Sequence, residues 1–346
     1  MAVSLIWILF VVFVLFMLAL DLGVFNRKAH VISVKESLLW TAFWIGVALC
    51  FNVLLYFMYE HHWLGIGTHP DHTTGGWDAA VFFFQGYVVE KCLSLDNIFV
   101  IALIFTYFGV DRKYQHRVLF WGILGALLMR GLMIGLGAAL IKQFDWILYV
   151  FAAILLLTAI KMMFAGDEKV DPERNPLVKV ARKIFPVTSG FEGQKFFSKV
   201  DGKLAITPMF LVLLVVESTD VIFAVDSIPA IFIITQDPFI VFTSNVFAIL
   251  GLRSLYFALA GILAVFHYVK HALIVVLIFV AMKMFLHSFI KIEPGVSLAV
   301  IAGVLGIGII ASLIHAKRQG LKLTDITRET DELIHEHIEE HTHEKH

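Results

Sequence analysis

Residues 215–230 read VVESTDVIFAVDSIPA, which places three carboxylates inside an apolar run. A related stretch, VVEKCLSLDNIFV, occupies residues 88–100 and adds two more. Each run is hydrophobic enough to cross a bilayer, where a carboxylate near the membrane centre costs about 2.5–3.5 kcal/mol. Five such groups in two related segments indicate a function, and the most economical one is to hold a cation.

The overall composition is that of a membrane protein. Hydrophobic residues make up 59% of the chain and charged residues 16%, with a mean hydropathy of +0.85. Soluble domains are about half apolar and about a quarter charged, so we predict an all-α, polytopic protein in contact with the lipid bilayer. The net charge of -1 suggests no nucleic-acid partner. The two cysteines, Cys50 and Cys92, have no zinc-type or redox spacing.

Apolar runs of about twenty residues predict the membrane-spanning helices. We expect about nine, near residues 4–25, 37–59, 78–108, 115–141, 146–165, 205–235, 240–266, 271–290 and 295–316. Basic residues gather in alternate loops, which is typical of the cytoplasmic side. The chain between Glu60 and Trp77 holds no Lys or Arg, whereas residues 166–204 are rich in both. This bias predicts a periplasmic N-terminus and a cytoplasmic C-terminus.

An internal repeat relates the two acidic segments. Glu90 and Asp96 precede Asp220 and Asp226 by the same 130 residues. Further polar pairs follow in the same order at similar offsets: Asn97 and Ser227, Arg130 and Arg253, Lys161 and Lys283. Each unit holds three helices, and because three is odd the second copy must enter from the opposite face. We therefore predict two inverted three-helix repeats, as in many secondary transporters.

The repeat gives the domain organisation. It predicts two N-terminal helices and an outer loop over 1–77, a first repeat over 78–165, a cytosolic loop over 166–204, a second repeat over 205–290, a last helix over 291–316 and a cytosolic His/Glu-rich tail over 317–346.

Helix geometry adds a condition on the site. Six residues of regular helix leave Glu90 and Asp96 about 120° apart, and the same holds for Asp220 and Asp226. Neither pair points at one ion from an unbroken helix, so either the helix unwinds between the two carboxylates or they line different faces. Pro229 removes a backbone hydrogen bond and clashes with the carbonyl of Val225. We therefore expect discontinuous helices at the centre.

The candidate ligands all offer oxygen, which suits hard divalent cations such as Mn²⁺, Mg²⁺ or Ca²⁺. They are Glu90, Asp96, Asn97, Glu217, Asp220, Asp226 and Ser227. The alternative is a structural ion-pair network with the intramembrane bases Lys91, Arg130, Lys161, Arg253 and Lys283. A metal site and an ion-pair network are compatible. Too many unpaired carboxylates would hold the ion too tightly, so basic residues that balance part of the negative charge would allow its release. Arg130, Arg253 and Lys91 are the candidates for that role.

The two acidic motifs resemble a known family. EKCLSLDNIFV (90–100) and DVIFAVDSIPA (220–230) are similar to the two signatures of the TerC family of integral membrane proteins, and QFDWILY (143–149) and TSNVFAILGLR (243–253) strengthen the match. The similarity runs from about residue 5 to 316 and is greatest to the alkali-inducible Alx branch. It implies a bacterial inner-membrane protein linked to manganese efflux, with Glu90, Asp96, Asn97, Glu217, Asp220 and Asp226 as metal ligands. The His-rich tail lies outside the family pattern.

These observations favour a transporter that exports Mn²⁺ from the cytosol through a midplane carboxylate site. Export of a divalent cation against the membrane potential needs coupling, and proton entry would supply it. We expect no catalytic residues and no cofactor other than the bound or transported Mn²⁺. The alternative is a membrane factor that delivers metal to exported enzymes without moving ions itself. A further alternative is an intramembrane enzyme, which would need two aspartates sharing a proton. The many other oxygen ligands near the aspartates favour metal binding instead. The sequence does not indicate the oligomeric state.

Overall fold

The structure, a computed structural model, describes residues 2–23, 34–68, 73–144, 146–164, 175–188, 190–200, 202–259, 268–286 and 292–318. The predicted tail over 317–346 lies almost entirely outside these residues. The elements in chain order are α1 (Ala2–Gly23), α2 (Val34–Glu60), η1 (Trp63–Gly65), α3 (Gly76–Phe108), α4 (Arg112–Gln143), α5 (Ile147–Phe164), α6 (Pro176–Ile184), β1 (Phe197–Val200), β2 (Lys203–Ile206), α7 (Pro208–Ile234), α8 (Pro238–Ile249), α9 (Leu252–Leu259), α10 (Val269–Phe285) and α11 (Pro294–Arg318).

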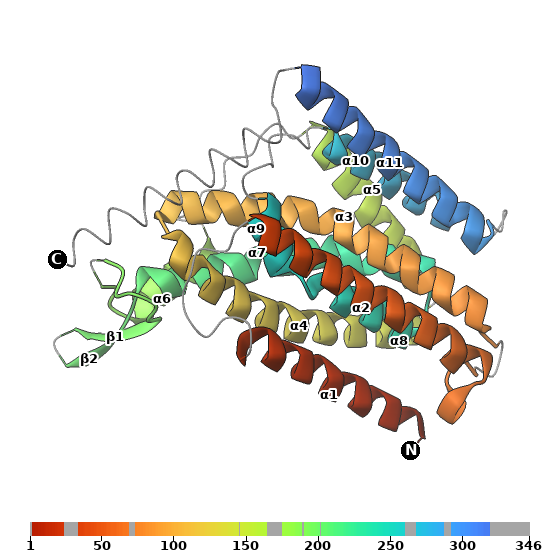
Figure 1. Ribbon diagram of the computed structural model, residues 1–346, viewed down its shortest axis with the longest axis horizontal. Coiled ribbons are helices and arrows are strands. Elements are labelled where there is room, and N and C mark those ends of the chain that lie inside the picture. Colours follow the sequence, from red (N-terminus) through yellow and green to blue (C-terminus); the bar gives the residue numbers. More distant parts are fainter. Residues whose placement is uncertain are drawn as a thin grey trace.

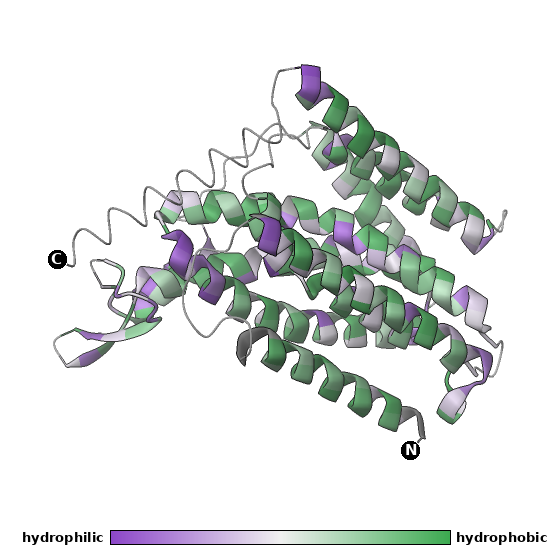
Figure 2. Ribbon diagram, in the orientation of Figure 1, coloured by the Kyte–Doolittle hydropathy of each residue, from purple (hydrophilic) through white to green (hydrophobic). Residues whose placement is uncertain are grey.

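The fold is a bundle of long apolar helices with one small polar appendage (Figure 1). Hydrophobic residues run along most of each long helix (Figure 2). Large apolar side chains also cover the outside of the bundle. Leu128 on α4 and Ile307 on α11, for example, are each 70% exposed. A surface of this kind is stable against lipid, so the chain is an integral, multi-pass membrane protein.

Six stretches of the described chain are long and apolar enough to cross a membrane. They are Lys35–Glu60, Arg112–Gln143, Ile147–Phe164, Pro208–Ile234, Pro238–Leu259 and Pro294–Arg318. Helix α3 has 33 residues but carries Glu90, Lys91 and Asp96 near its middle. Nine crossings and the inverted repeat therefore stay predictions.

The centre of the bundle is built by α3, α4, α7 and α8. Helix α7 packs against α3, α4 and α5, and α8 packs against α3 and α4. Small residues allow this close approach: a β-carbon at Gly86 of α3 would lie 2.7 Å from the hydroxyl oxygen of Ser244 on α8. Helices α10 and α11 pack together at one side, and α10 also contacts α5. Side chains of α3 and α7 that face this centre are therefore shielded from lipid, whereas Ile222 of α7 and Phe99 of α3, on the outer faces, are 63% and 45% exposed.

The predicted unwinding between the paired carboxylates is wrong. Helix α3 is continuous from Gly76 to Phe108, and α7 is continuous from Pro208 to Ile234 with Pro229 inside it. Pro229 is buried, and tight packing by neighbouring helices lets a membrane helix tolerate an internal proline. The cost of one lost backbone bond is too small to open α7 there.

The helix discontinuity lies instead between α8 and α9. Helix α8 ends at Ile249, Leu250 follows with a non-helical backbone (φ -56°, ψ 128°), and Gly251 adopts a left-handed φ of 80° before α9 begins. This break falls within the expected 240–266 span. Helix α4, its counterpart in the predicted first repeat, is unbroken over 32 residues. A left-handed residue is typical of glycine, so Gly251 is the residue that permits the break.

The polar appendage follows α5 in the chain. It contains the short helix α6 and the antiparallel hairpin β1–β2, in which Phe197 pairs with Ile206 and Val200 with Lys203. Asn175 caps α6 by accepting hydrogen bonds from the backbone of Leu177 and Val178. In Figure 1 this appendage lies at the end of the bundle opposite η1. It falls within the predicted cytosolic loop over 166–204.

Asp237 fixes the start of α8 and joins it to α2. Its carboxylate accepts hydrogen bonds from the backbone N–H of Phe239 (2.9 Å) and Ile240 (3.4 Å), and from the Tyr59 hydroxyl (2.7 Å). We expect Asp237→Ala to lower the free energy of unfolding by about 2 kcal/mol, because it removes a helix cap and leaves a buried hydroxyl without its acceptor. Unfolding of purified protein in detergent measures this. Asp237→Asn keeps an acceptor oxygen and should lose less than half as much; equal losses would contradict the assignment.

Candidate functional site

A buried guanidinium lies where the four central helices meet. Arg130 on α4 is only 2% exposed. It forms an ion pair with Glu90 of α3 through Nη1 and a two-point ion pair with Asp220 of α7, from Nη2 to Oδ1 at 3.1 Å and from Nε to Oδ2 at 3.4 Å. Nη1 also lies 3.3 Å from the Ser227 hydroxyl and 3.0 Å from Oδ1 of Asn245 on α8. All its partners are oxygen atoms.

Regular helix geometry positions these oxygens. Asp220 and Ser227 are seven residues apart, so they lie on one face of α7 about two turns from each other. The amide of Asn245 is oriented by its own helix, because its Nδ2 donates to the Val241 carbonyl at 2.9 Å. Its oxygen is thereby left to face Arg130. A guanidinium keeps its charge at any accessible pH, so burial requires such partners.

Glu217 adds a third carboxylate beside this cluster. It lies one turn before Asp220 on α7, and the two carboxylates interact electrostatically. Its carboxylate packs directly over Gly125 of α4, where any β-carbon would overlap it. No described basic residue forms an ion pair with Glu217. The sequence of α4 therefore makes room for an acidic group next to the Arg130 cluster.

Three buried oxygens on one face of α3 have no hydrogen-bond partner. They are Oε2 of Glu90, Oγ of Ser94 and Oδ1 of Asn97, on residues that are 0%, 1% and 3% exposed. The spacing i, i+4, i+7 places them in a row. Most buried polar atoms in native proteins have a partner, so this row indicates room for water or a ligand.

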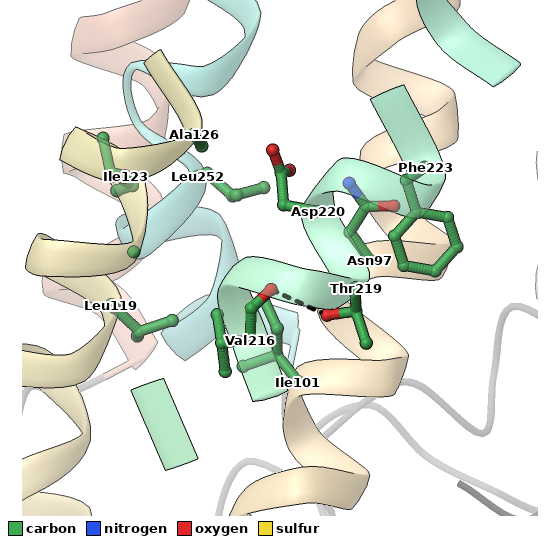
Figure 3. Close-up of a pocket in the computed structure, with 11 residues that line it drawn as sticks. Asn97, Ile101, Leu119, Ile123, Ala126, Val216, Thr219, Asp220, Phe223 and Leu252 are labelled. Atoms are coloured by element: carbon green, nitrogen blue, oxygen red, sulfur yellow. Dashed lines mark hydrogen bonds between the residues drawn. The ribbon is translucent and has the colours of Figure 1, made fainter. Parts of the chain in front are cut away.

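A cavity of about 20 Å³ adjoins the row. Asn97, Thr219 and Asp220 line it together with apolar side chains of α3, α4, α7 and α9 (Figure 3). Its volume is close to that of one water molecule. In Figure 3 the side chains of Asp220 and Asn97 lie next to each other at the edge of this space. The cavity therefore leads from the surroundings of Asn97 to one of the carboxylates that hold Arg130.

Asp226 lies apart from this cluster. Its Oδ1 accepts a hydrogen bond from the Thr158 hydroxyl of α5 at 2.7 Å, and Lys161 of the same helix acts on it electrostatically. The 120° rotation between residues six apart explains the separation. Asp220 turns towards α4, whereas Asp226 turns towards α5.

Thr158 should contribute measurably to stability through Asp226. We expect Thr158→Val to lower the free energy of unfolding by about 1–3 kcal/mol, because a partly buried carboxylate loses a donor. Thr106→Val is the matched control, since the exposed Thr106 hydroxyl donates only to the carbonyl of Ala102 in its own helix. Unfolding of both variants in detergent measures the difference. Equal midpoints would show that the Thr158–Asp226 bond contributes nothing.

The predicted ligands are thus only partly brought together. Glu90, Asp220 and Ser227 meet at Arg130, with Glu217 and Asn97 beside them. The side chain of Asp96 lies outside the described part of the chain. Among the described residues, no three acidic, His or Cys side chains are arranged to hold a metal ion. The carboxylates of Glu90 and Asp220 are instead paired with Arg130.

In the described part of the chain, the other two predicted charge-balancing residues do not contact Asp220, although Lys91 acts electrostatically on Glu90. The Lys91 ammonium is 3.5 Å from the carbonyl of Leu250, at the break between α8 and α9, and 5.9 Å from the Tyr87 ring centroid. Arg253 is buried on α9. Asn245 is a further site residue, which was not among the ligands predicted from the sequence. Its signal was the polar triplet Thr243, Ser244 and Asn245 inside an otherwise apolar helix.

A family model for the integral membrane protein TerC family matches residues 75–320. The chain belongs to the TerC family. The match includes both acidic motifs, Arg130 and Asn245, so the whole Arg130 cluster lies within the TerC region.

Individual TerC relatives are similar over almost their full length. An uncharacterized membrane protein of Myxococcus xanthus is 47% identical over 311 residues, which cover 90% of this chain and 92% of the relative. An uncharacterized membrane protein of Rickettsia bellii is 42% identical over 309 residues, with 89% and 97% covered. A protein of Escherichia coli K12, provisionally named membrane-bound redox modulator Alx, is 43% identical over 302 residues, with 87% and 92% covered. No solved structure matches the chain.

Proposed function

We propose that this TerC protein exports a divalent cation, Mn²⁺, from the cytosol across the bacterial inner membrane. The observation that carries the proposal is the charge of the central cluster. Glu90, Asp220 and Glu217 lie around the Arg130 guanidinium, and the buried Lys91 ammonium acts electrostatically on Glu90, so the group keeps a net charge of -1 when all of these side chains are ionised. An uncompensated charge in a low-dielectric interior is costly. One divalent cation offsets this excess.

The chemistry of the available donors supports a hard ion. Around Arg130 they are carboxylate, hydroxyl and amide oxygens, and the partnerless atoms of Ser94 and Asn97 extend the same oxygen set. Such ligands suit Mn²⁺, Mg²⁺ and Ca²⁺ better than soft or borderline metals. Manganese is preferred among these because the TerC resemblance implies it. Asp96 and Asp226 stay predicted ligands at other positions of the ion's path.

The proposed transporter has two inverted repeats and crosses the membrane nine times. Helix α3 begins at the η1 end of the bundle, whereas α7 begins at the end that carries α6 and the hairpin (Figure 1). The two acidic helices therefore run in opposite directions, which supports inversion. The lysines and arginines of the appendage favour the cytosol for that end, with the N-terminus in the periplasm.

Export in this direction requires an energy source. A membrane potential that is negative inside opposes the exit of each positive charge by about 2.3 kcal/mol per 100 mV. Proton entry through the same carboxylates would supply the coupling. The account therefore expects Mn²⁺ efflux to fall when the proton gradient is removed.

The printed name of the Escherichia coli relative raises redox modulation as another function. A thiol-based mechanism within one chain needs a pair of cysteines. This chain has two cysteines, Cys50 on α2 and Cys92 on α3. No disulfide joins them, and the buried polar cluster is built of oxygen and nitrogen donors. The site therefore supports ion binding in preference to thiol exchange.

Flux by the purified protein alone tests the proposal and separates it from metal delivery to exported enzymes. The full chain is reconstituted into vesicles that contain a fluorescent Mn²⁺ indicator, with a proton gradient imposed. We expect Mn²⁺ accumulation above that of empty vesicles. If the protein binds Mn²⁺ but does not move it, a delivery role replaces export. If it neither binds nor moves Mn²⁺, Mg²⁺ or Ca²⁺, the ion assignment is wrong.

A further inference from the structure

Arg130 occupies a set of atoms that would also bind the cargo. Its guanidinium contacts five oxygen atoms, one from Glu90, two from Asp220, one from Ser227 and one from Asn245. Two carboxylates with a hydroxyl and an amide oxygen are a donor set that hard divalent cations prefer. A guanidinium and a metal ion cannot share these atoms, because two cations repel strongly where the dielectric constant is low.

A second, independent observation points to a ligand at this place. Ser94 and Asn97 are buried, have partnerless oxygens and lie on the same α3 face as Glu90, whose second carboxylate oxygen is also partnerless. The row ends at the cavity between Asn97 and Asp220 (Figure 3). The helices thus present more oxygen atoms than Arg130 can satisfy. The surplus oxygen of Asn97 lies beside the cavity that Asp220 also lines.

The rigidity of Asn245 supports the same conclusion. Its amide nitrogen is held by the Val241 carbonyl, so its oxygen keeps facing the cluster whether or not Arg130 is present. The two-point contact with Asp220 holds the guanidinium on α7 in a similar fixed geometry. The oxygens are therefore prearranged by the helices, and only the long Arg130 side chain needs to move.

We infer that Arg130 is a tethered cation that competes with the transported ion for Glu90, Asp220 and Asn245. The ion binds these residues when the guanidinium moves aside, and the return of the guanidinium releases the ion. Glu217, a described carboxylate with no ion-pair partner beside Asp220, offers the displaced guanidinium a second position. This inference rests on the proposed function and adds to it the residue that determines release, together with Asn245 as a ligand.

Equilibrium Mn²⁺ binding to the full chain in lipid nanodiscs tests the competition. We expect Arg130→Gln to bind Mn²⁺ about tenfold more tightly than the wild type, within the usual range of coupling between two competing ligands. Its Mn²⁺ flux in vesicles should fall, because the bound ion is no longer expelled. Arg130→Lys keeps the positive charge but loses the two-point contact. Its Mn²⁺ affinity should therefore lie between those of the wild type and Arg130→Gln. Arg117→Gln, at the start of α4 outside the cluster, is the matched control and should bind as the wild type does.

The outcomes separate this inference from the proposed function. If Arg130→Gln is folded and binds Mn²⁺ no more tightly than the wild type, the arginine serves only to join helices and the competition is refuted. If that variant does not fold, Asn245→Ala decides, because it leaves both ion pairs of Arg130 in place. It should weaken Mn²⁺ binding about tenfold, and unchanged binding would refute the site. If the wild-type protein itself neither binds nor transports Mn²⁺, the proposed function is overturned instead.

Discussion

Glu90→Gln is expected to reduce Mn²⁺ flux in vesicles about 100-fold. The substitution keeps the shape of the side chain but removes one of the two carboxylates at the centre of the bundle. Removing even a supporting partner of a metal ligand costs 10–100-fold, so a direct ligand should reach at least the upper value. Arg130 would keep its ion pair with Asp220, and therefore the helices should stay together. Initial rates of Mn²⁺ uptake measure the effect.

Asp78→Asn is the matched control for this prediction. Asp78 lies on the same helix, in the first turn of α3, and is exposed. It should transport at the rate of the wild type, since a solvated carboxylate outside the cluster neither binds the ion nor balances Arg130. Thermal unfolding of both variants shows whether the fold is intact. Near-normal flux by Glu90→Gln, or an equal loss by Asp78→Asn, would contradict the central role of the cluster.

The second large effect is expected at the helix break. Gly251→Ala should lower the free energy of unfolding by about 3 kcal/mol. A left-handed backbone costs a residue other than glycine about 1–3 kcal/mol, and overpacking costs typically about 1–3 kcal/mol more. A β-carbon at position 251 would lie 2.8 Å from both Cβ and Cγ of Trp44, so α2 and α9 would have to separate. Unfolding followed by tryptophan fluorescence in detergent measures the loss.

Gly46→Ala provides the comparison for Gly251→Ala. Gly46 lies on α2 only two residues from Trp44, and a β-carbon there would meet no atom within 4 Å. Alanine in a helix interior is favoured over glycine by about 0.5–1 kcal/mol, so this variant should be as stable as the wild type or slightly more stable. If both variants unfold like the wild type, the α8–α9 break does not depend on glycine.

The difference between Pro229 and Gly251 shows what sequence reasoning could and could not predict of the fold. The apolar runs indicated the long helices because bilayer thickness sets their length. The position of the break was missed because proline is a strong local signal, whereas the packing that keeps α7 straight is contributed by distant segments. Gly251 follows an apolar helix with no other turn residue nearby, so its left-handed backbone left no local pattern to detect.

The site was predictable only in its residue types. Carboxylates inside apolar helices marked Glu90 and Asp220 because their burial is costly, and Arg130 was one of three candidates for the counter-charge, with Arg253 and Lys91. The sequence could not show that Arg130 contacts both, since the two ion pairs join residues 40 and 90 positions apart. The sequence also suggested that Asp220 and Asp226 belong to one centre, but the two carboxylates face different helices, α4 and α5. Asn245 was missed because a single amide has no spacing that distinguishes a ligand from a helix contact.

A structure of the full chain with Mn²⁺, recorded with anomalous scattering at the manganese edge, tests the central claim most directly. The account predicts a manganese peak within coordination distance of the Glu90 and Asp220 carboxylates and the Asn245 amide oxygen, with the Arg130 guanidinium moved away from both carboxylates. A manganese peak elsewhere in the bundle, with Arg130 still paired to Glu90 and Asp220, would contradict it.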